Sequence, residues 1–103
     1  MRVILDENVP HPLIARLTGH LFSTVQQEGW SGKKNGELLN LIEAAGWDVF
    51  VTADQSVQYQ QNLQQRLLAI IQLPSNRWPV VQGLVTDIQD AIDNSQAGTL
   101  TQL

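Results

Sequence analysis

Short apolar runs alternate along the chain with segments in which apolar residues recur at helical spacing. The run over residues 3–5 is continuous, as expected for a strand that is buried on both faces of a parallel sheet. The predicted strands cover residues 3–5, 21–25, 49–52 and 67–73. Alternation of strands with helices is typical of an α/β protein with a parallel sheet.

Amphipathic segments fill the stretches between and after the predicted strands. Helices are predicted after Asn8, after Asn35, over residues 55–63 behind Asp54, and over residues 79–93. Asn8 and Asn35 stand where N-cap residues are favoured, and a glycine ends each of their helices. Right-handed crossovers would place helices on both faces of the sheet. We therefore expect a three-layer sandwich around a central, mostly parallel four-stranded sheet.

The chain has 103 residues, which is enough for one domain with its own core. We assign the domain to residues 1–93 and expect a polar tail over residues 94–103. The absence of cysteine excludes disulfides and thiolate metal sites. The chain begins without a signal-peptide pattern, and no apolar run reaches membrane-spanning length, so we expect a cytoplasmic protein without membrane contact.

Three acidic residues are predicted to meet at one edge of the sheet. Asp6 follows the first strand, Asp54 follows the third, and Glu37 lies in the first turn of the helix after the second. The carboxyl ends of parallel strands form the edge where α/β proteins bind ligands. Carboxylates that lie close together need a cation or a proton, and Mg²⁺ or Mn²⁺ suits a site of a few carboxylates. Glu7, next to Asp6, is expected to be a supporting group.

These acids also have structural interpretations. Asp54 can cap the helix that follows it, and the helix dipole favours Glu37 near a helix N-terminus. Asp6 is harder to explain in this way, because carboxylates are rarely buried without a partner.

The net charge of −4 does not favour nucleic-acid binding, because attraction to phosphate needs a positive surface. Lys33 and Lys34 form a cationic pair in the loop sequence GWSGKK. This loop lacks the spacing of a Walker A motif. The two lysines could contact a phosphate backbone beside the acidic site, or they could belong to a solvated loop.

The segments VILDENVP, KNGELL and VFVTADQSVQYQQNL resemble the short PIN-like proteins of the PIN-domain superfamily, over roughly residues 1–73. The resemblance implies an α/β sandwich with a parallel sheet and a Mg²⁺- or Mn²⁺-dependent ribonuclease activity. It also implies that Asp6, Glu37 and Asp54 are catalytic and bind the metal, which would activate a water and clamp the scissile phosphate. Asn8 would hold Asp6 or a water in place.

The resemblance has further implications and one departure. PIN nucleases commonly have a fourth acidic or polar metal ligand, for which this chain offers Ser56 and Asn62, neither of them charged. Several PIN domains are the toxins of toxin–antitoxin pairs. The resemblance therefore implies an RNA substrate, a small antitoxin protein as a partner, and a homodimer.

Two other functions fit the same residues. A PIN-like fold without catalysis would serve as a protein-binding module, and the missing fourth ligand favours this interpretation. A phospho-accepting receiver domain also carries an acidic pair after its first strand and an aspartate after its third, which here are Asp6, Glu7 and Asp54. A receiver needs a lysine after its fifth strand, and this sequence has none after Lys34.

Overall fold

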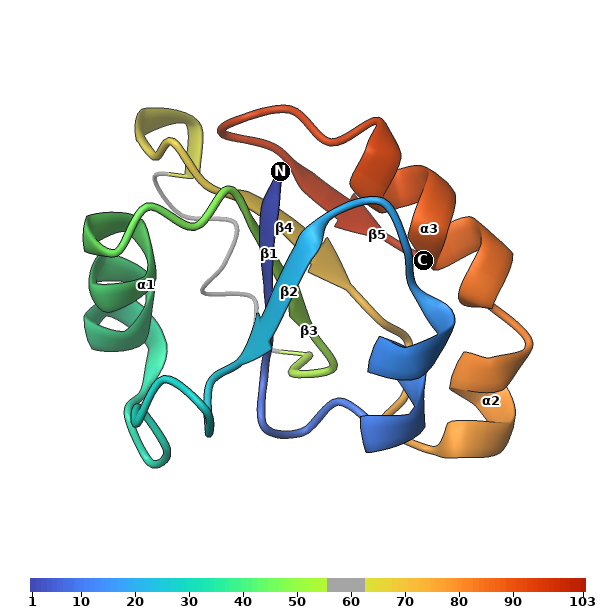
Figure 1. Ribbon diagram of the computed structural model, residues 1–103. Helices are drawn as coiled ribbons and strands as arrows, with labels where there is room; N and C mark the ends of the chain where they lie inside the picture. Colours follow the sequence, from blue (N-terminus) through green and yellow to red (C-terminus); the bar gives the residue numbers. More distant parts are fainter. Residues whose placement is uncertain (56–62) are drawn as a thin grey trace.

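The computed structural model describes residues 1–55 and 63–103 of the chain. Its strands are β1 (Arg2–Leu5), β2 (Leu21–Thr24), β3 (Val49–Thr52), β4 (Ala69–Gln72) and β5 (Leu100–Gln102). Its helices are α1 (Asn35–Ala44), α2 (Trp78–Gln82) and α3 (Val85–Asp93), with the short 3₁₀ helices η1 (His11–Arg16) and η3 (Leu63–Gln65). Figure 1 shows the helices arranged around a central sheet.

Within these residues the strands form one parallel sheet in the order β2-β1-β3-β4-β5 (Figure 1). The predicted α/β fold with a parallel sheet is confirmed, but the described part of the chain contributes five strands, not four. The additional strand, β5, lies in the predicted polar tail and pairs with β4, with Thr101 opposite Ile71. The apolar pattern misses β5 because this short edge strand is only partly buried.

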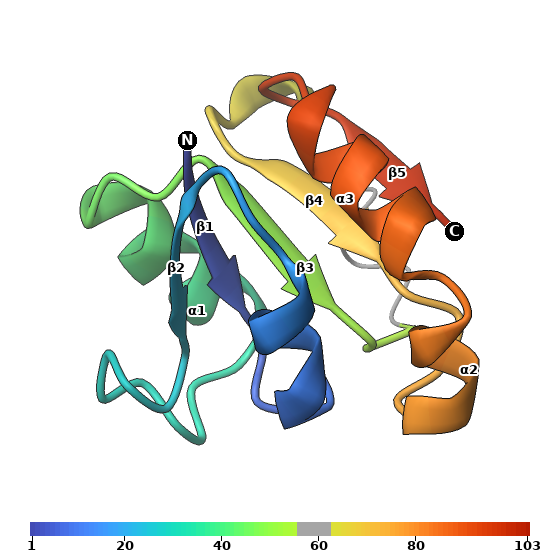
Figure 2. The ribbon, with the colours of Figure 1, turned by 45° about the vertical axis from the view of Figure 1, so that its right-hand side comes forward.

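Helices cover both faces of the sheet and make three layers (Figure 2). In β1, Val3 and Leu5 pack on the face that carries η1, α2 and α3, whereas Ile4 packs on the face that carries α1. This follows from the alternation of side chains along a strand. All residues of β3 and β4 are buried, so both faces of these strands contribute to a core.

The crossover from β4 to β5 has the opposite hand to the crossover from β1 to β2. Both connections pass over the face that carries η1, α2 and α3, but they step across the sheet in opposite directions (Figure 2). Connections between parallel strands are right-handed in about 98% of cases. The first crossover follows this rule and the last one is left-handed, which brings α2 into contact with η1.

The helix predicted over residues 79–93 is divided into α2 and α3. Gly83 ends α2, and glycine is among the residues that lower helix propensity most. Apolar spacing continues across the break and conceals it in the sequence. Val81, Ile88 and Ile92 are fully buried, and Leu84 and Val85 are partly buried against the same core. The amphipathic pattern predicted for this segment is therefore confirmed.

The remaining helical predictions have different outcomes. Asn8 does not cap η1, which begins at His11 with no side-chain cap. Residues 56–62, which hold most of the helix predicted after Asp54, lie outside the described residues. In the described ranges, none of the helices has the length and apolar character needed to span a membrane.

Candidate functional site

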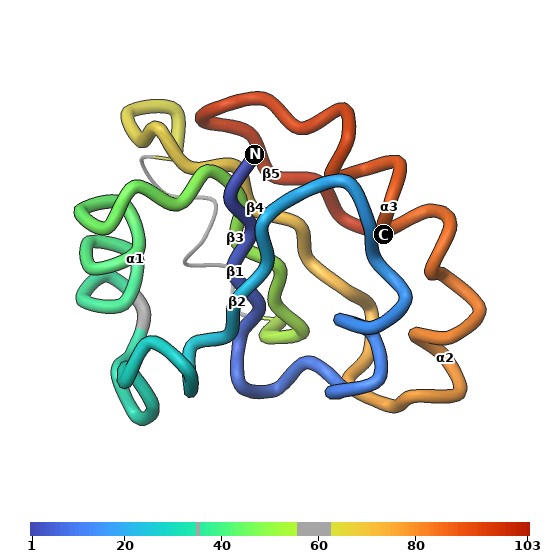
Figure 3. The backbone as a smooth tube through the Cα atoms, viewed as in Figure 1, coloured from blue at the N-terminus to red at the C-terminus, as the bar shows by residue number. Residues whose placement is uncertain are grey.

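The carboxyl ends of β1, β2 and β3 lie at the lower edge of the sheet in Figure 3. β1 is flanked by β2 and β3, so the chain leaves β1 toward one side and later returns to its other side. Ligands of such sheets bind beside this switch point, outside the carboxyl ends of the strands. Asp6 follows β1 directly and Asp54 follows β3 after Ala53, so both lie at this edge.

Asp6 is bound by neutral hydrogen-bond donors. Its Oδ2 accepts from the Thr52 hydroxyl at 2.7 Å, and its Oδ1 accepts from the Glu7 N–H at 2.8 Å. Asp6 is 8% exposed, and burial raises the pKa of its carboxyl. The charges of Glu7 and Asp54 also raise this pKa, whereas the hydrogen bonds from Thr52 and Glu7 oppose the shift without cancelling it.

Thr52 connects the two aspartates. It is fully buried at the end of β3, where its hydroxyl donates to Asp6 and accepts from the Asp54 N–H at 3.1 Å. One hydroxyl therefore joins the segments that follow β1 and β3. In the sequence analysis Thr52 appears only as part of the segment VFVTADQSVQYQQNL, with no role assigned to it. The signal for its role is a hydrogen-bonding side chain at the end of a strand that is otherwise apolar.

Asp6 and Asp54 share a cavity of about 300 Å³ at this edge. Its lining residues are Asp6, Glu7, Asn8, Lys33, Lys34, Leu38 and Asp54. The structure thus brings together at one cavity most of the residues that the sequence identifies as candidates. The cavity carries both signs of charge, because two lysines stand beside the carboxylates.

Glu37 is not among the residues that line this cavity. Its carboxylate lies 3.2 Å from the Lys33 ammonium in an i,i+4 pair, and its side chain is 64% exposed. Glu37 therefore contacts Lys33, which lines the cavity, but does not line the cavity itself. Its assignment as a metal ligand stays a prediction. Ser56 and Asn62, the candidates for a fourth ligand, lie outside the described residues.

Asn8 and Glu7 tie neighbouring loops to the cavity. The side-chain oxygen of Asn8 accepts from the Ala53 N–H at 3.1 Å, so Asn8 joins the loops after β1 and β3. The Glu7 carboxylate accepts from the Gly32 N–H at 3.4 Å, in the loop that leads to the lysines. Both contacts fix the backbone around Asp6.

The donor set at the cavity suits a cation of the magnesium type. Mg²⁺ binds through one or two carboxylates and keeps several waters, and Asp6 and Asp54 supply two carboxylates. A cation would also offset the free-energy cost of burying the Asp6 charge, because the hydrogen bonds to this carboxylate come from neutral donors. Over residues 1–55 and 63–103, no group of three His, Asp or Glu side chains is arranged to hold a metal ion. The fit therefore rests on two carboxylates.

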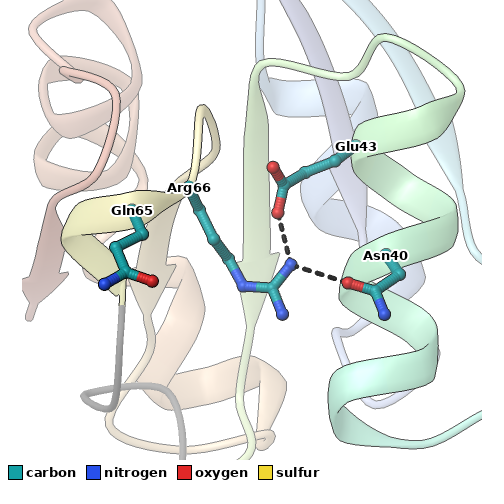
Figure 4. A pocket seen from close by; sticks show the side chains of 4 residues that line it. All are labelled: Asn40, Glu43, Gln65 and Arg66. Carbon is teal, nitrogen blue, oxygen red and sulfur yellow. Dashed lines mark hydrogen bonds and ion pairs between the residues drawn. The ribbon is translucent and has the colours of Figure 1, made fainter.

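A second cavity, of about 310 Å³, lies between α1 and η3 (Figure 4). The Arg66 guanidinium makes an ion pair with Glu43 and donates to the Asn40 side-chain oxygen at 3.1 Å. The other Glu43 oxygen accepts from the Leu67 N–H at 3.3 Å. These contacts fasten the segment before β4 to α1, so we assign this cavity a structural role.

Glu43→Gln is expected to lower the free energy of unfolding by about 1 kcal/mol, because the partly buried guanidinium of Arg66 loses its counter-charge. Urea unfolding measures the change. Glu37→Gln is the matched control, since it removes a more exposed ion pair and should change stability by less than about 0.5 kcal/mol. Equal losses in the two variants would contradict the fastening role of Glu43.

The fold and the cavity together define the class of the protein. It is an α/β protein whose described residues form a five-stranded parallel sheet, with a cavity of mixed charge at the carboxyl ends of its strands. Comparisons with protein-family models, with curated proteins and with solved structures found no match for the chain.

Proposed function

We propose that this protein is a Mg²⁺- or Mn²⁺-dependent nuclease that cleaves RNA and has a PIN-like fold. The observation that carries the proposal is that Asp6, Asp54, Lys33 and Lys34 line the same cavity. A metal-dependent nuclease uses negative groups to hold the cation, and positive groups help it to hold the phosphate backbone. The cavity combines both kinds of group at the edge of the sheet where ligands bind.

Asp6 and Asp54 would hold the cation through their carboxylate oxygens. When bound, Mg²⁺ or Mn²⁺ supplies an activated water and neutralises charge on the scissile phosphate. The Thr52 hydroxyl and the Glu7 N–H orient the Asp6 carboxylate, and each of its oxygens keeps a further lone pair for a ligand. Lys33 and Lys34 would contact the phosphates of the RNA strand.

The first test is Mn²⁺ binding by calorimetry, followed by cleavage of a single-stranded RNA in Mn²⁺ or in EDTA. We expect the wild type to bind Mn²⁺ with a dissociation constant of roughly micromolar to millimolar. Asp54→Asn should weaken this binding by about tenfold or more. Asp87→Asn, at an exposed position of α3, is the matched charge control and should bind like the wild type. A wild type that neither binds Mn²⁺ nor cleaves RNA refutes the proposal.

Glu37→Gln separates two roles for Glu37. If Glu37 acts only on Lys33, the variant should bind Mn²⁺ within about threefold of the wild type. It should bind RNA more tightly, because Lys33 loses a competing counter-charge. Calorimetry with Mn²⁺ and filter binding with RNA measure the two affinities. A loss of Mn²⁺ affinity of about tenfold or more would instead assign Glu37 to the metal, as the resemblance implies.

A protein-binding module without catalysis is the second candidate, because the described side chains form no group of three metal ligands. Such a module needs no cation at its cavity, so Mn²⁺ should leave its melting temperature unchanged. An antitoxin and a second copy of the chain are the partners that the resemblance implies for either function.

The receiver alternative keeps one supporting observation. The strand order β2-β1-β3-β4-β5 is that of doubly wound folds whose switch point lies between the first and third strands, and receiver domains share it. The sequence nevertheless has no lysine after Lys34. A receiver would bind beryllofluoride at Asp54 in the presence of Mg²⁺, and the proposed nuclease would not.

A further inference from the structure

A chain of side-chain hydrogen bonds connects β5 to Asp54. Gln72, the last residue of β4, is 6% exposed, and its Nε2 donates to the Asp54 carbonyl at 2.7 Å. Gln102, in β5, donates from its own Nε2 to the Gln72 Oε1 at 2.7 Å. The two glutamines form a relay that runs from the C-terminal strand to the backbone of a cavity residue. Gln55 braces the same segment, since its Nε2 donates to the Leu73 carbonyl.

We propose that Gln72 and Gln102, the glutamine relay, are positioning residues for Asp54, so that β5 completes the candidate site. This inference rests on the proposed function. An amide side chain has a donor end and an acceptor end. Gln102 donates to the acceptor end of Gln72 and thereby keeps its donor end toward Asp54. Without that donor, the Gln72 amide can turn over and present its oxygen to the Asp54 carbonyl, which would push the segment away.

The burial of Gln72 supports a role beyond packing. Gln72 follows Ile70 and Ile71 in β4, where every residue is buried. Burying an amide lowers stability unless its donors and acceptors are paired, and a leucine or methionine would fill such a position without this requirement. The Gln72 side-chain oxygen accepts from Gln102 of β5, and the Gln72 Nε2 donates to the Asp54 carbonyl. The sequence signal is a glutamine inside an apolar run. The strand prediction over residues 67–73 includes this glutamine but assigns it no role.

β5 is held in place by contacts that do not involve the relay side chains. The Gly98 N–H, just before β5, donates to the Leu68 carbonyl at 3.0 Å. Gly98 has a φ of +76°, and a Cβ at this position would lie 3.3 Å from the Gln64 carbonyl oxygen. Substitutions of the Gln102 side chain can therefore alter the relay while β5 stays paired with β4.

The test compares a donor and an acceptor at position 102. Gln102→Lys keeps a donor to Gln72, Gln102→Glu removes it, and Thr101→Val in the same strand is the control. Calorimetry gives the Mn²⁺ affinity, and a ¹H–¹⁵N NMR spectrum of the metal-free protein gives the environment of the Asp54 amide. Gln102→Glu should weaken Mn²⁺ binding by about three- to tenfold and shift the Asp54 amide signal. Gln102→Lys and Thr101→Val should resemble the wild type in both measurements.

Charge alone predicts the reverse order, because an added carboxylate attracts Mn²⁺ and an added ammonium repels it. Affinities that follow the charge, or an Asp54 amide that is unmoved in Gln102→Glu, overturn the inference. If the wild type does not bind Mn²⁺, the proposed function fails. The NMR comparison then still decides whether the relay positions Asp54.

Discussion

Asp6→Asn is expected to abolish Mn²⁺ binding and to slow Mn²⁺-dependent RNA cleavage by about 100-fold or more, while it stabilises the folded protein. Function is lost because asparagine offers one neutral oxygen where Asp6 offers two charged oxygens. Stability is gained because the Asp6 carboxylate is 8% exposed and bonded to neutral donors, so its charge is unfavourable in the folded state. We expect the free energy of unfolding to rise at neutral pH in metal-free buffer.

This gain should vary with pH in one direction. Burial raises the pKa of the Asp6 carboxyl above its value in the unfolded chain. Between these two pKa values the folded wild type holds more protons than the unfolded chain, so its stability falls as the pH rises through this interval. Below the unfolded-state pKa, Asp6 is protonated in both states. The advantage of Asp6→Asn should therefore be smallest at low pH and complete above the folded-state pKa.

Urea unfolding over a range of pH values in EDTA measures the stability difference, and calorimetry and RNA cleavage measure the functional loss. Asp87→Asn removes an exposed carboxylate from α3 and should show neither the pH-dependent gain nor the loss of cleavage. A gain of equal size at every pH would contradict the buried charge as its cause. Retained cleavage by Asp6→Asn would remove Asp6 from the catalytic site.

The fold could be predicted where burial is complete. Val49–Thr52 is predicted as a strand and forms β3 with the same bounds, because all its residues are buried and the apolar run has no competing pattern. Leu100–Gln102 could not be found in this way, since an edge strand that is partly exposed has no such run. The left-handed crossover that leads to it brings α2 against η1, and no local sequence pattern encodes that long-range contact.

The candidate site could be predicted to the level of the sheet edge but not to the level of side-chain partners. Asp6 and Asp54 share a cavity because β1 and β3 are paired neighbours whose carboxyl ends coincide. Glu37 lies in the first turn of α1, as predicted. Its position in the helix does not determine which residue its side chain contacts, and in the structure it pairs with Lys33. The glutamine relay joins β4, β5 and the loop after β3, so only the tertiary structure brings it together.

Thr52→Val should destabilise the protein by about 1 to 3 kcal/mol and weaken Mn²⁺ binding by about tenfold. Valine has nearly the shape of threonine but no hydroxyl, so Asp6 loses a donor and the Asp54 N–H loses its acceptor. The hydrogen bond from Thr52 lowers the pKa of Asp6, and its removal raises that pKa further above the unfolded-state value. The destabilisation should therefore be smallest where Asp6 is protonated and should grow as the pH rises through the folded-state pKa.

Thr52→Ser separates the hydroxyl of Thr52 from its packing. Serine keeps the hydroxyl and removes one buried methyl group, so we expect a loss of about 1 kcal/mol that is the same at every pH. Its Mn²⁺ affinity should stay near that of the wild type. Equal Mn²⁺ affinities and equal pH profiles in the two variants would show that the hydroxyl does not join Asp6 to Asp54. Binding by Thr52→Ser but not by Thr52→Val would mean that one oxygen atom at the end of β3, and not the shape of that strand, holds the two aspartates in position for a cation.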